Sequence, residues 1–131
     1  MKTNPAIGLL ILRLFIGFRL IYGVIDNILS WDKLLEFSEF LAAHSFPLPV
    51  VSALLSVYVQ FICSALLIVG FKTRLAAIVL VFNFIVAFFA VHIPDHDSIE
   101  GMTPALAMLF GCLTLFFTGA GKLSIEKEIS Q

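Results

Sequence analysis

The stretch from residue 50 to residue 93 reads VVSALLSVYVQFICSALLIVGFKTRLAAIVLVFNFIVAFFAVHI. It contains two long apolar runs, Val50–Gly70 and Leu75–Ile93, and neither run carries an Asp, Glu, Lys or Arg. About 20 apolar residues, each rising about 1.5 Å in an α-helix, cross a hydrocarbon core about 30 Å thick. A turn with the sequence Gly-Phe-Lys-Thr-Arg joins the two runs, so the stretch predicts two consecutive membrane-spanning helices.

Two further apolar runs flank this pair, Ala6–Leu29 before it and Thr103–Gly119 after it. No run alternates with a period of two, which excludes a transmembrane β-barrel. Of the 131 residues, 60% are hydrophobic and 13% charged, against about 45–50% and about 25% in soluble domains. The net charge of −1 gives no indication of nucleic-acid binding. The predicted fold is all-α, a transmembrane four-helix bundle forming a single domain over residues 1–131.

The distribution of basic residues predicts the orientation. The first run contains Arg13 and Arg19 and is followed by no small-x-small cleavage site, so we interpret it as an uncleaved membrane helix. With four spans, both chain ends and the loop between spans two and three share one side. That side carries Lys2, Lys72, Arg74, Lys122 and Lys127, and the other carries only Lys33. The positive-inside rule then predicts that both termini are cytoplasmic.

The loop between spans one and two has a helical pattern of its own. From Trp31 to Ser45, apolar residues form one arc of a helical wheel and charged residues the opposite arc, with Phe40 among the charged ones. Ser30 is a suitable N-cap, and Pro47 and Pro49 end the pattern. We expect a short amphipathic helix that lies on the membrane surface or folds over the mouth of the bundle; a solvated connecting helix is the alternative.

Several polar residues lie inside the predicted membrane spans. Placing a charged side chain in the bilayer costs several kcal/mol, so such residues are usually paired with another polar group or have a functional role. Arg19, Gln60 and Asn83 fall near the middle of spans one, two and three, so we expect them to meet inside the bundle. Arg13 points elsewhere and is expected to bond to Gln60 and backbone carbonyls or to extend toward the cytoplasm. The candidate ligand-binding residues are Arg13, Arg19, Tyr22, Asp26, Gln60 and Asn83.

Two interpretations of these polar side chains stay open. In one, the side chains satisfy each other and hold the helices in register, with Arg19 partly neutralised by Asp26 two turns away. In the other, they line a pocket for a small ligand or a quinone head group, flanked by Phe82, Phe84 and Phe88. None of these residues carries electrons, so redox activity would need a partner protein or a cofactor held elsewhere. We expect no intrinsic cofactor, and a quinone is the candidate ligand.

Other chemistry has weaker support in the sequence. A metal site at His92, His96 and Asp97 is disfavoured because Pro94 interrupts the helix that would align the two imidazoles. Cys63 and Cys112 lie inside apolar runs and form no CxxC pattern. No local signature of a catalytic triad or of a phosphate-binding loop is present. We therefore expect no metal and no catalytic residue, and the chain is predicted not to be catalytic on its own.

Several segments in order along the chain resemble the DoxX family of small four-span bacterial membrane proteins. The similar segments are Arg13-Leu14-Phe15-Ile16-Gly17, Tyr22-Gly23, Phe46-Pro47-Leu48-Pro49, the stretch from Leu67 to Ala77, and Gly119-Ala120-Gly121-Lys122-Leu123-Ser124-Ile125-Glu126. Family members often carry His-Gly-x-x-Lys at the end of span one and Glu in span two. This chain has Tyr22-Gly23-Val24-Ile25-Asp26 and Gln60 instead, and the missing carboxylate removes a natural partner for Arg13.

The resemblance implies an integral protein of the bacterial cytoplasmic membrane with loose ties to respiratory and redox work. Relatives include a subunit of a thiosulfate:quinone oxidoreductase and partners of sulfur-transfer and superoxide-defence enzymes. Distant eukaryotic relatives look like cargo receptors or assembly chaperones. The leading expectation is an accessory subunit of a membrane redox or quinone-linked complex with a membrane or cytoplasmic redox partner. The alternative is a non-redox assembly factor that recognises partner proteins; a small-molecule carrier is less well supported because no broken helices are evident.

Overall fold

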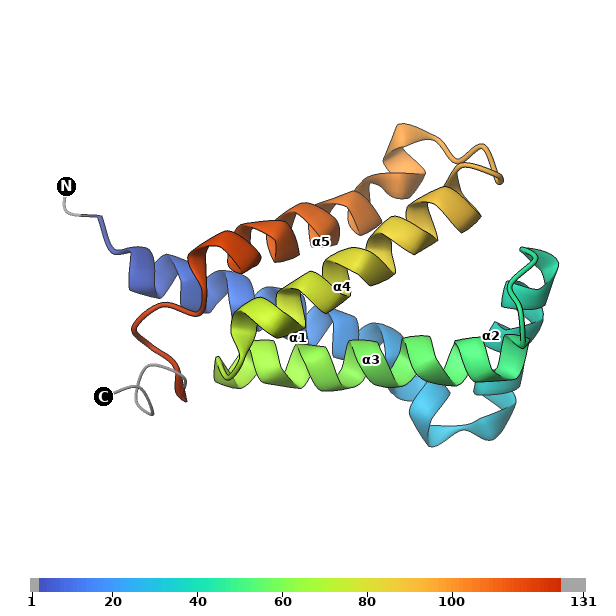
Figure 1. The fold of residues 1–131 in the computed structure, drawn as a ribbon, viewed down its shortest axis with the longest axis horizontal. Helices are drawn as coiled ribbons and strands as arrows, with labels where there is room; N and C mark the ends of the chain where they lie inside the picture. The colour runs from blue at the N-terminus through green and yellow to red at the C-terminus, as the bar shows by residue number, and fades with distance from the viewer. Residues whose placement is uncertain (1–2, 126–131) are drawn as a thin grey trace.

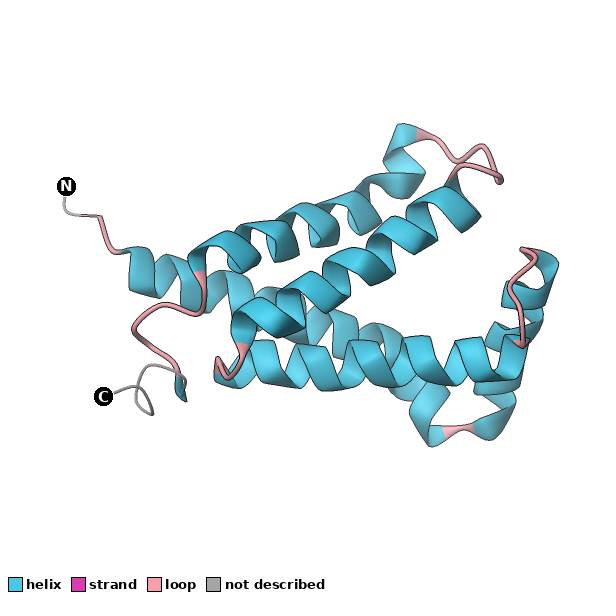
Figure 2. Ribbon diagram, viewed as in Figure 1, coloured by secondary structure: helices cyan, strands magenta, loops and turns pink. Residues whose placement is uncertain are grey.

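The computed structural model describes residues 3–125, and every regular element in that range is helical (Figures 1 and 2). Lys2, Glu126 and Lys127, all used above, lie outside the described residues. The elements are α1 (Pro5–Leu29), α2 (Trp31–Ala43), α3 (Pro49–Val69), α4 (Thr73–Ala87), the π-helix η1 (Phe88–His92) and α5 (Ile99–Thr118).

Four of these segments are long and apolar enough to cross a membrane: α1, α3, α4 continued by η1, and α5. This confirms the prediction of four spans. The described chain begins and ends at the same end of the bundle, which also carries the α3–α4 turn (Figure 1). We call this the terminal end, and the end that carries α2 and the α4–α5 loop the distal end.

The fourth span begins earlier than predicted. The expected start was Thr103, but α5 starts at Ile99 because the Ser98 side chain caps it by accepting a hydrogen bond from the Gly101 amide at 3.0 Å. An oxygen side chain at this position satisfies one of the amides that a helix start leaves unpaired. Pro104 lies inside the helix near its start. The first turn of α5 thus precedes the predicted apolar run.

The spans associate as two pairs that separate toward the distal end. In Figure 1, α1 lies along α3 and α4 along α5, and the two pairs converge at the terminal end. Gly17 permits the close approach of α1 and α3, because a Cβ there would collide with Ile68 and with the Ser64 carbonyl. Small residues at helix crossings give membrane helices the close packing that holds them together.

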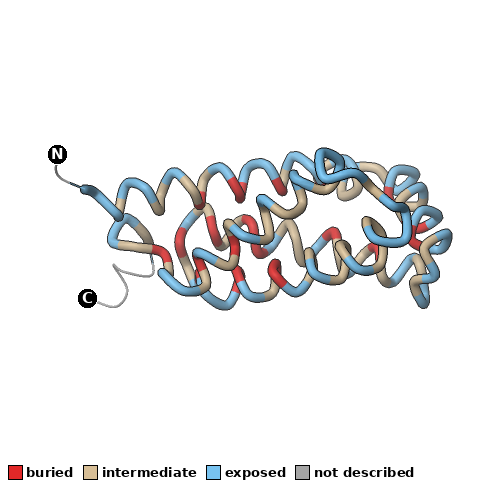
Figure 3. The backbone as a smooth tube through the Cα atoms, turned by 90° about the horizontal axis from the view of Figure 1, so that it is seen from above, coloured by how far each residue is buried: buried red, intermediate tan, exposed pale blue. Residues whose placement is uncertain are grey.

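The buried residues, red in Figure 3, form two clusters. The larger joins all four spans nearer the terminal end and includes Ile16, Leu67, Leu80 and Leu115. The smaller joins only α1, α2 and α3 at the distal end, through Val24, Leu34, Leu41, Ala53 and Val57. Because α4 and α5 contribute no buried residue to the second cluster, the distal half of the bundle is less tightly packed.

The helix between spans one and two is confirmed, and it folds over the mouth of the bundle. The Ser30 hydroxyl caps α2 by accepting from the Lys33 amide at 3.3 Å. Leu34 and Leu41 are buried against α1 and α3, as the apolar arc predicts. Trp31, by contrast, is 57% exposed although it belongs to that arc.

Candidate functional site

A cavity of about 500 Å³ lies between α3 and α4 on the distal side of the bundle centre, and α2 contributes to its wall. Aromatic and aliphatic side chains make up most of its lining. We call it the aromatic cavity; its ring-bearing residues are Phe37, Phe40, Phe46, Phe82, Phe84 and His92. Its volume is within the range of about 300–1,000 Å³ that is typical of small-molecule sites.

A short chain of hydrogen bonds runs along the wall of this cavity. Gln60 Nε2 donates to the Ser56 hydroxyl at 3.1 Å, and that hydroxyl donates to Asn83 Oδ1 at 3.2 Å. All three side chains line the cavity. Among the described residues, no hydrogen bond from Asn83 Nδ2 is found. The Asn83 amide, together with the second N–H of Gln60, is therefore available to donate to a ligand carbonyl.

The π-helix η1 shapes the distal part of the cavity. Widening of the last turn of span three at Phe88–His92 places Val91 and His92 in the cavity wall. Single π-turns inside α-helices occur frequently at functional sites. Phe82 and Phe84 line the cavity as expected, whereas Phe88 does not.

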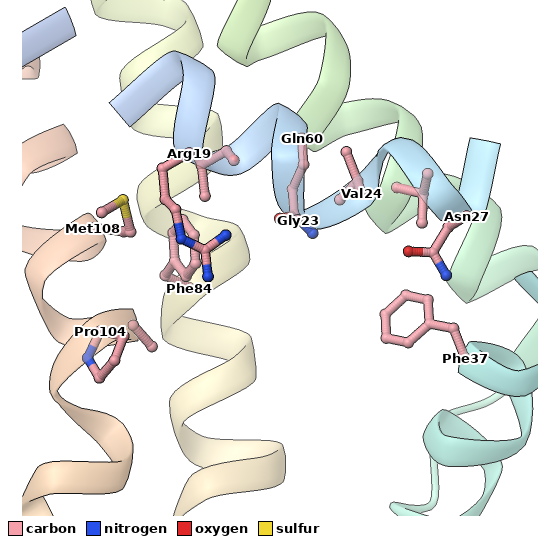
Figure 4. Close-up of a pocket in the computed structure, with 12 residues that line it drawn as sticks. Arg19, Gly23, Val24, Asn27, Phe37, Gln60, Phe84, Pro104 and Met108 are labelled. Atoms are coloured by element: carbon pink, nitrogen blue, oxygen red, sulfur yellow. The ribbon is translucent and has the colours of Figure 1, made fainter. Parts of the chain in front are cut away.

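A second cavity, of about 350 Å³, lies between α1 and the α4–α5 pair (Figure 4). Arg19, Asn27 and Gln60 are its polar lining residues, and Phe84, Pro104 and Met108 are among the apolar ones. We call it the arginine cavity. It shares Phe37, Gln60 and Phe84 with the aromatic cavity, so the two adjoin.

The structure therefore corrects the prediction of one central polar cluster. Arg19 and Asn83 line different cavities, and of the three predicted cluster residues Gln60 lines both. Arg19 is exposed rather than buried in the bundle interior, because α1 and the α4–α5 pair separate at its depth. Tyr22 is 76% exposed and lines neither cavity, although its ring centroid lies 5.6 Å from Arg19 Cζ.

The expected neutralisation of Arg19 by Asp26 is wrong as well. Within residues 3–125, the ion pairs are Lys33–Glu36, His44–Asp95 and His92–Asp97, and none includes Arg19 or Asp26. Instead the guanidinium lies beside Gly23, one turn further along α1. A Cβ at Gly23 would be 3.2 Å from Arg19 Nη1, so the glycine leaves room for the guanidinium.

Arg13 is fully buried at the terminal end of the bundle, away from both cavities. Its guanidinium donates to the Leu67 carbonyl at 3.2 Å and to the Leu123 carbonyl. The predicted bonds to backbone carbonyls are thus present, whereas Gln60 bonds to Ser56 instead. Arg13 joins α1 to the end of α3 and to the segment after α5, and this role in packing separates it from the other candidate residues.

Two histidine–aspartate pairs lie at the distal end. His44, at the end of α2, is 2.8 Å from Asp95 of the α4–α5 loop, and His92 Nδ1 is 2.7 Å from Asp97 Oδ2. The Phe40 carbonyl, which accepts from His44 Nδ1 at 2.8 Å, and then Asp95 raise the pKa of His44 above its usual value. Both ring nitrogens of His44 thus face acceptors, which favours the imidazolium form. Among residues 3–125, no group of three His, Cys, Asp or Glu side chains is placed to hold a metal.

Sequence reasoning missed Ser56, His44 and Asp95. A serine one helical turn before Gln60 is a visible signal, because i and i+4 side chains share a helix face. The His44–Asp95 pair has no such signal, since the two residues are far apart in sequence and α2 must fold over the bundle to join them.

Comparison with known proteins gives one match. The model of the DoxX family matches residues 8–93 of this chain. No curated protein and no solved structure matches it.

Proposed function

This chain belongs to the DoxX family, and we propose that it is an accessory membrane subunit that holds a quinone, or a similar carbonyl-bearing lipophile, in its aromatic cavity for a redox partner. Family membership and four apolar helices make it a membrane protein. The quinone and the partner are parts of the proposal. With Lys72, Arg74 and Lys122 near the terminal end and Lys33 at the distal end, we place the terminal end in the cytoplasm of a bacterial cell.

The observation that carries the proposal is the combination of the Gln60–Ser56–Asn83 chain with an aromatic lining. A quinone needs donors for its carbonyl oxygens and flat apolar surface for its ring. The Asn83 amide and the free N–H of Gln60 supply donors on one wall, and Phe82 and Phe84 supply rings nearby. The cavity adjoins lipid-exposed helix faces, because residues such as Phe82 are 69% exposed.

The chain's own residues would bind and orient the ring and exclude water from it. None of the cavity side chains accepts an electron, so oxidation or reduction requires the partner. Cys63 and Cys112 are the free cysteines of residues 3–125, and neither lines either cavity. The chain itself would therefore be non-catalytic.

Binding of a decyl-substituted benzoquinone to purified protein in maltoside micelles tests the proposal, with thermal unfolding followed by circular dichroism. We expect a saturable rise in the midpoint, which decylbenzene, lacking carbonyls, does not produce. Asn83→Leu should abolish the rise and Ser56→Ala should weaken it, while Arg19→Gln leaves it unchanged because Arg19 lines the other cavity. Equal shifts from both compounds, or an unchanged shift in folded Asn83→Leu, would refute the quinone site and favour the assembly-factor alternative.

A further inference from the structure

We infer that the arginine cavity binds an amphipathic anion, a carboxylate or phosphate head group on a hydrocarbon chain, whose charge is held by Arg19. The inference rests on Arg19 and its cavity and is independent of the proposed quinone site.

The first observation is the depth of the charge. Arg19 lies ten residues before the end of α1 at Leu29, which is about 15 Å along the helix axis. The side chain extends toward that end, because its Nη1 lies beside Gly23. This direction shortens the distance to the membrane surface but leaves the guanidinium within the apolar span. A cation at such a depth needs an anion or water at its head group.

The second observation is the absence of an internal anion. Of the carboxylates in residues 3–125, none forms an ion pair with Arg19, and the nearby Tyr22 supplies only the face of its ring. A cation over a ring recovers little of the hydration that a guanidinium loses in hydrocarbon. Within residues 3–125 the guanidinium therefore has no counter-ion, and a bound anion would supply one.

The third observation is the shape and lining of the space that the guanidinium enters. Figure 4 shows Arg19 extending into the gap toward Phe84, with Pro104 and Met108 on the opposite helix. Gln60 and Asn27 are further polar residues of the wall. A lone hydrated anion would lose its water among these apolar groups. An anion that carries its own hydrocarbon chain matches both parts of the lining, with its oxygens on Arg19 and its chain against the aromatic and aliphatic side chains.

The planar guanidinium also selects the head group. It can donate two parallel hydrogen bonds to a carboxylate or a phosphate, and these charge-assisted bonds are about twice as strong as neutral ones. A fatty acid and an anionic phospholipid share this chemistry. The cavity of about 350 Å³ has room for a head group and the first part of a chain, and the remainder would lie against the lipid-facing surface.

Native mass spectrometry of the protein released from maltoside micelles counts bound molecules and tests the inference directly. The probes are palmitate, phosphatidic acid and, as a neutral control of the same chain length, hexadecanol. We expect one palmitate or phosphatidate per chain and no comparable binding of hexadecanol. Preference for palmitate over phosphatidate, or the reverse, identifies the source of the head group.

Three variants locate the site. Arg19→Gln should weaken binding of the anionic probe at least about tenfold, because it removes the charge-assisted bonds, and Arg19→Lys should retain part of the affinity. Asn83→Leu changes the aromatic cavity alone and should bind the anion as the wild type does. Equal binding of hexadecanol, or unchanged affinity in Arg19→Gln, would overturn the inference. Quinone binding is measured at the aromatic cavity and anion binding at the arginine cavity. A failure of the quinone proposal therefore leaves the anion proposal standing, and the reverse also holds.

Discussion

Replacing Arg13 by methionine should destabilise the protein by about 2–4 kcal/mol. Arg13 is fully buried and donates to two carbonyls, those of Leu67 and Leu123. The Leu67 carbonyl depends on it, because α3 ends at Val69 and the amides of the next two residues, Gly70 and Phe71, both bond to the Leu66 carbonyl instead. The last carbonyls of a helix have no partner within the helix and need one from elsewhere.

The magnitude follows from these contacts. A hydrogen bond from a charged donor contributes about 1.5–3 kcal/mol, and an unsatisfied buried carbonyl costs about 1–3 kcal/mol. Two bonds would thus give about 3–6 kcal/mol, but methionine also removes a buried charge, whose desolvation opposes folding. We therefore expect a net loss of stability of about 2–4 kcal/mol, which is in or slightly below the lower half of that range. Methionine retains an unbranched chain and leaves a smaller void than alanine would.

Equilibrium unfolding in mixed micelles of maltoside and dodecyl sulfate, followed by circular dichroism, measures the change. Arg74→Met is the matched control. Arg74 is exposed at the same end of the bundle and donates to the Phe116 carbonyl at 2.8 Å. Because this bond is not buried, its loss should cost about 0.5–1.5 kcal/mol, less than the loss of Arg13. If Arg13→Met unfolds within about 0.5 kcal/mol of the wild type, the buried guanidinium does not stabilise the bundle and the reasoning is wrong.

Three further predictions follow from the same structure. Reporter fusions at Thr73 should behave as cytoplasmic and fusions at Ser98 as external; finding both on one side would contradict four spans. His44→Asn should destabilise the distal end most below about pH 6.5, because the raised pKa of His44 in the folded protein stabilises the fold only while the imidazole is protonated. The destabilisation should shrink as the pH rises through that raised pKa. Amide hydrogen exchange of α2 at several pH values measures this, and a pH-independent difference would contradict it. Gly70→Ala should lower the midpoint of thermal unfolding, because Gly70 has φ +75° and a Cβ there would collide with Arg13. Gly8 has open space around it, so Gly8→Ala should be neutral or stabilising. Equal midpoints for the two variants would refute the argument.

Sequence and structure agree on the spans because the signal is local. A run such as Leu75–Ile93 must be helical in lipid, since each backbone polar group has to bond within its own segment. The amphipathic arc of residues 31–45 is local in the same sense, and so is the Ser30 cap. Arg13 was recognisable as a buried group because a charge inside an apolar run needs partners. These features follow from residue type and spacing along one helix.

The candidate site depended on the tertiary structure. The sequence predicts that Arg19, Gln60 and Asn83 share a depth, but depth does not determine which way a helix faces or how far it lies from its neighbour. The close approach at Gly17 holds α1 on α3, and the second buried cluster includes no residue of α4 or α5, so the pairs separate toward the distal end. That separation divides the polar residues between two cavities and leaves Gln60 in both. In a membrane, apolar side chains are equally well solvated by lipid and by each other, so hydrophobicity alone does not specify helix pairing. The pairing comes from shape, through small residues and specific polar contacts, and these act only between helices already placed side by side.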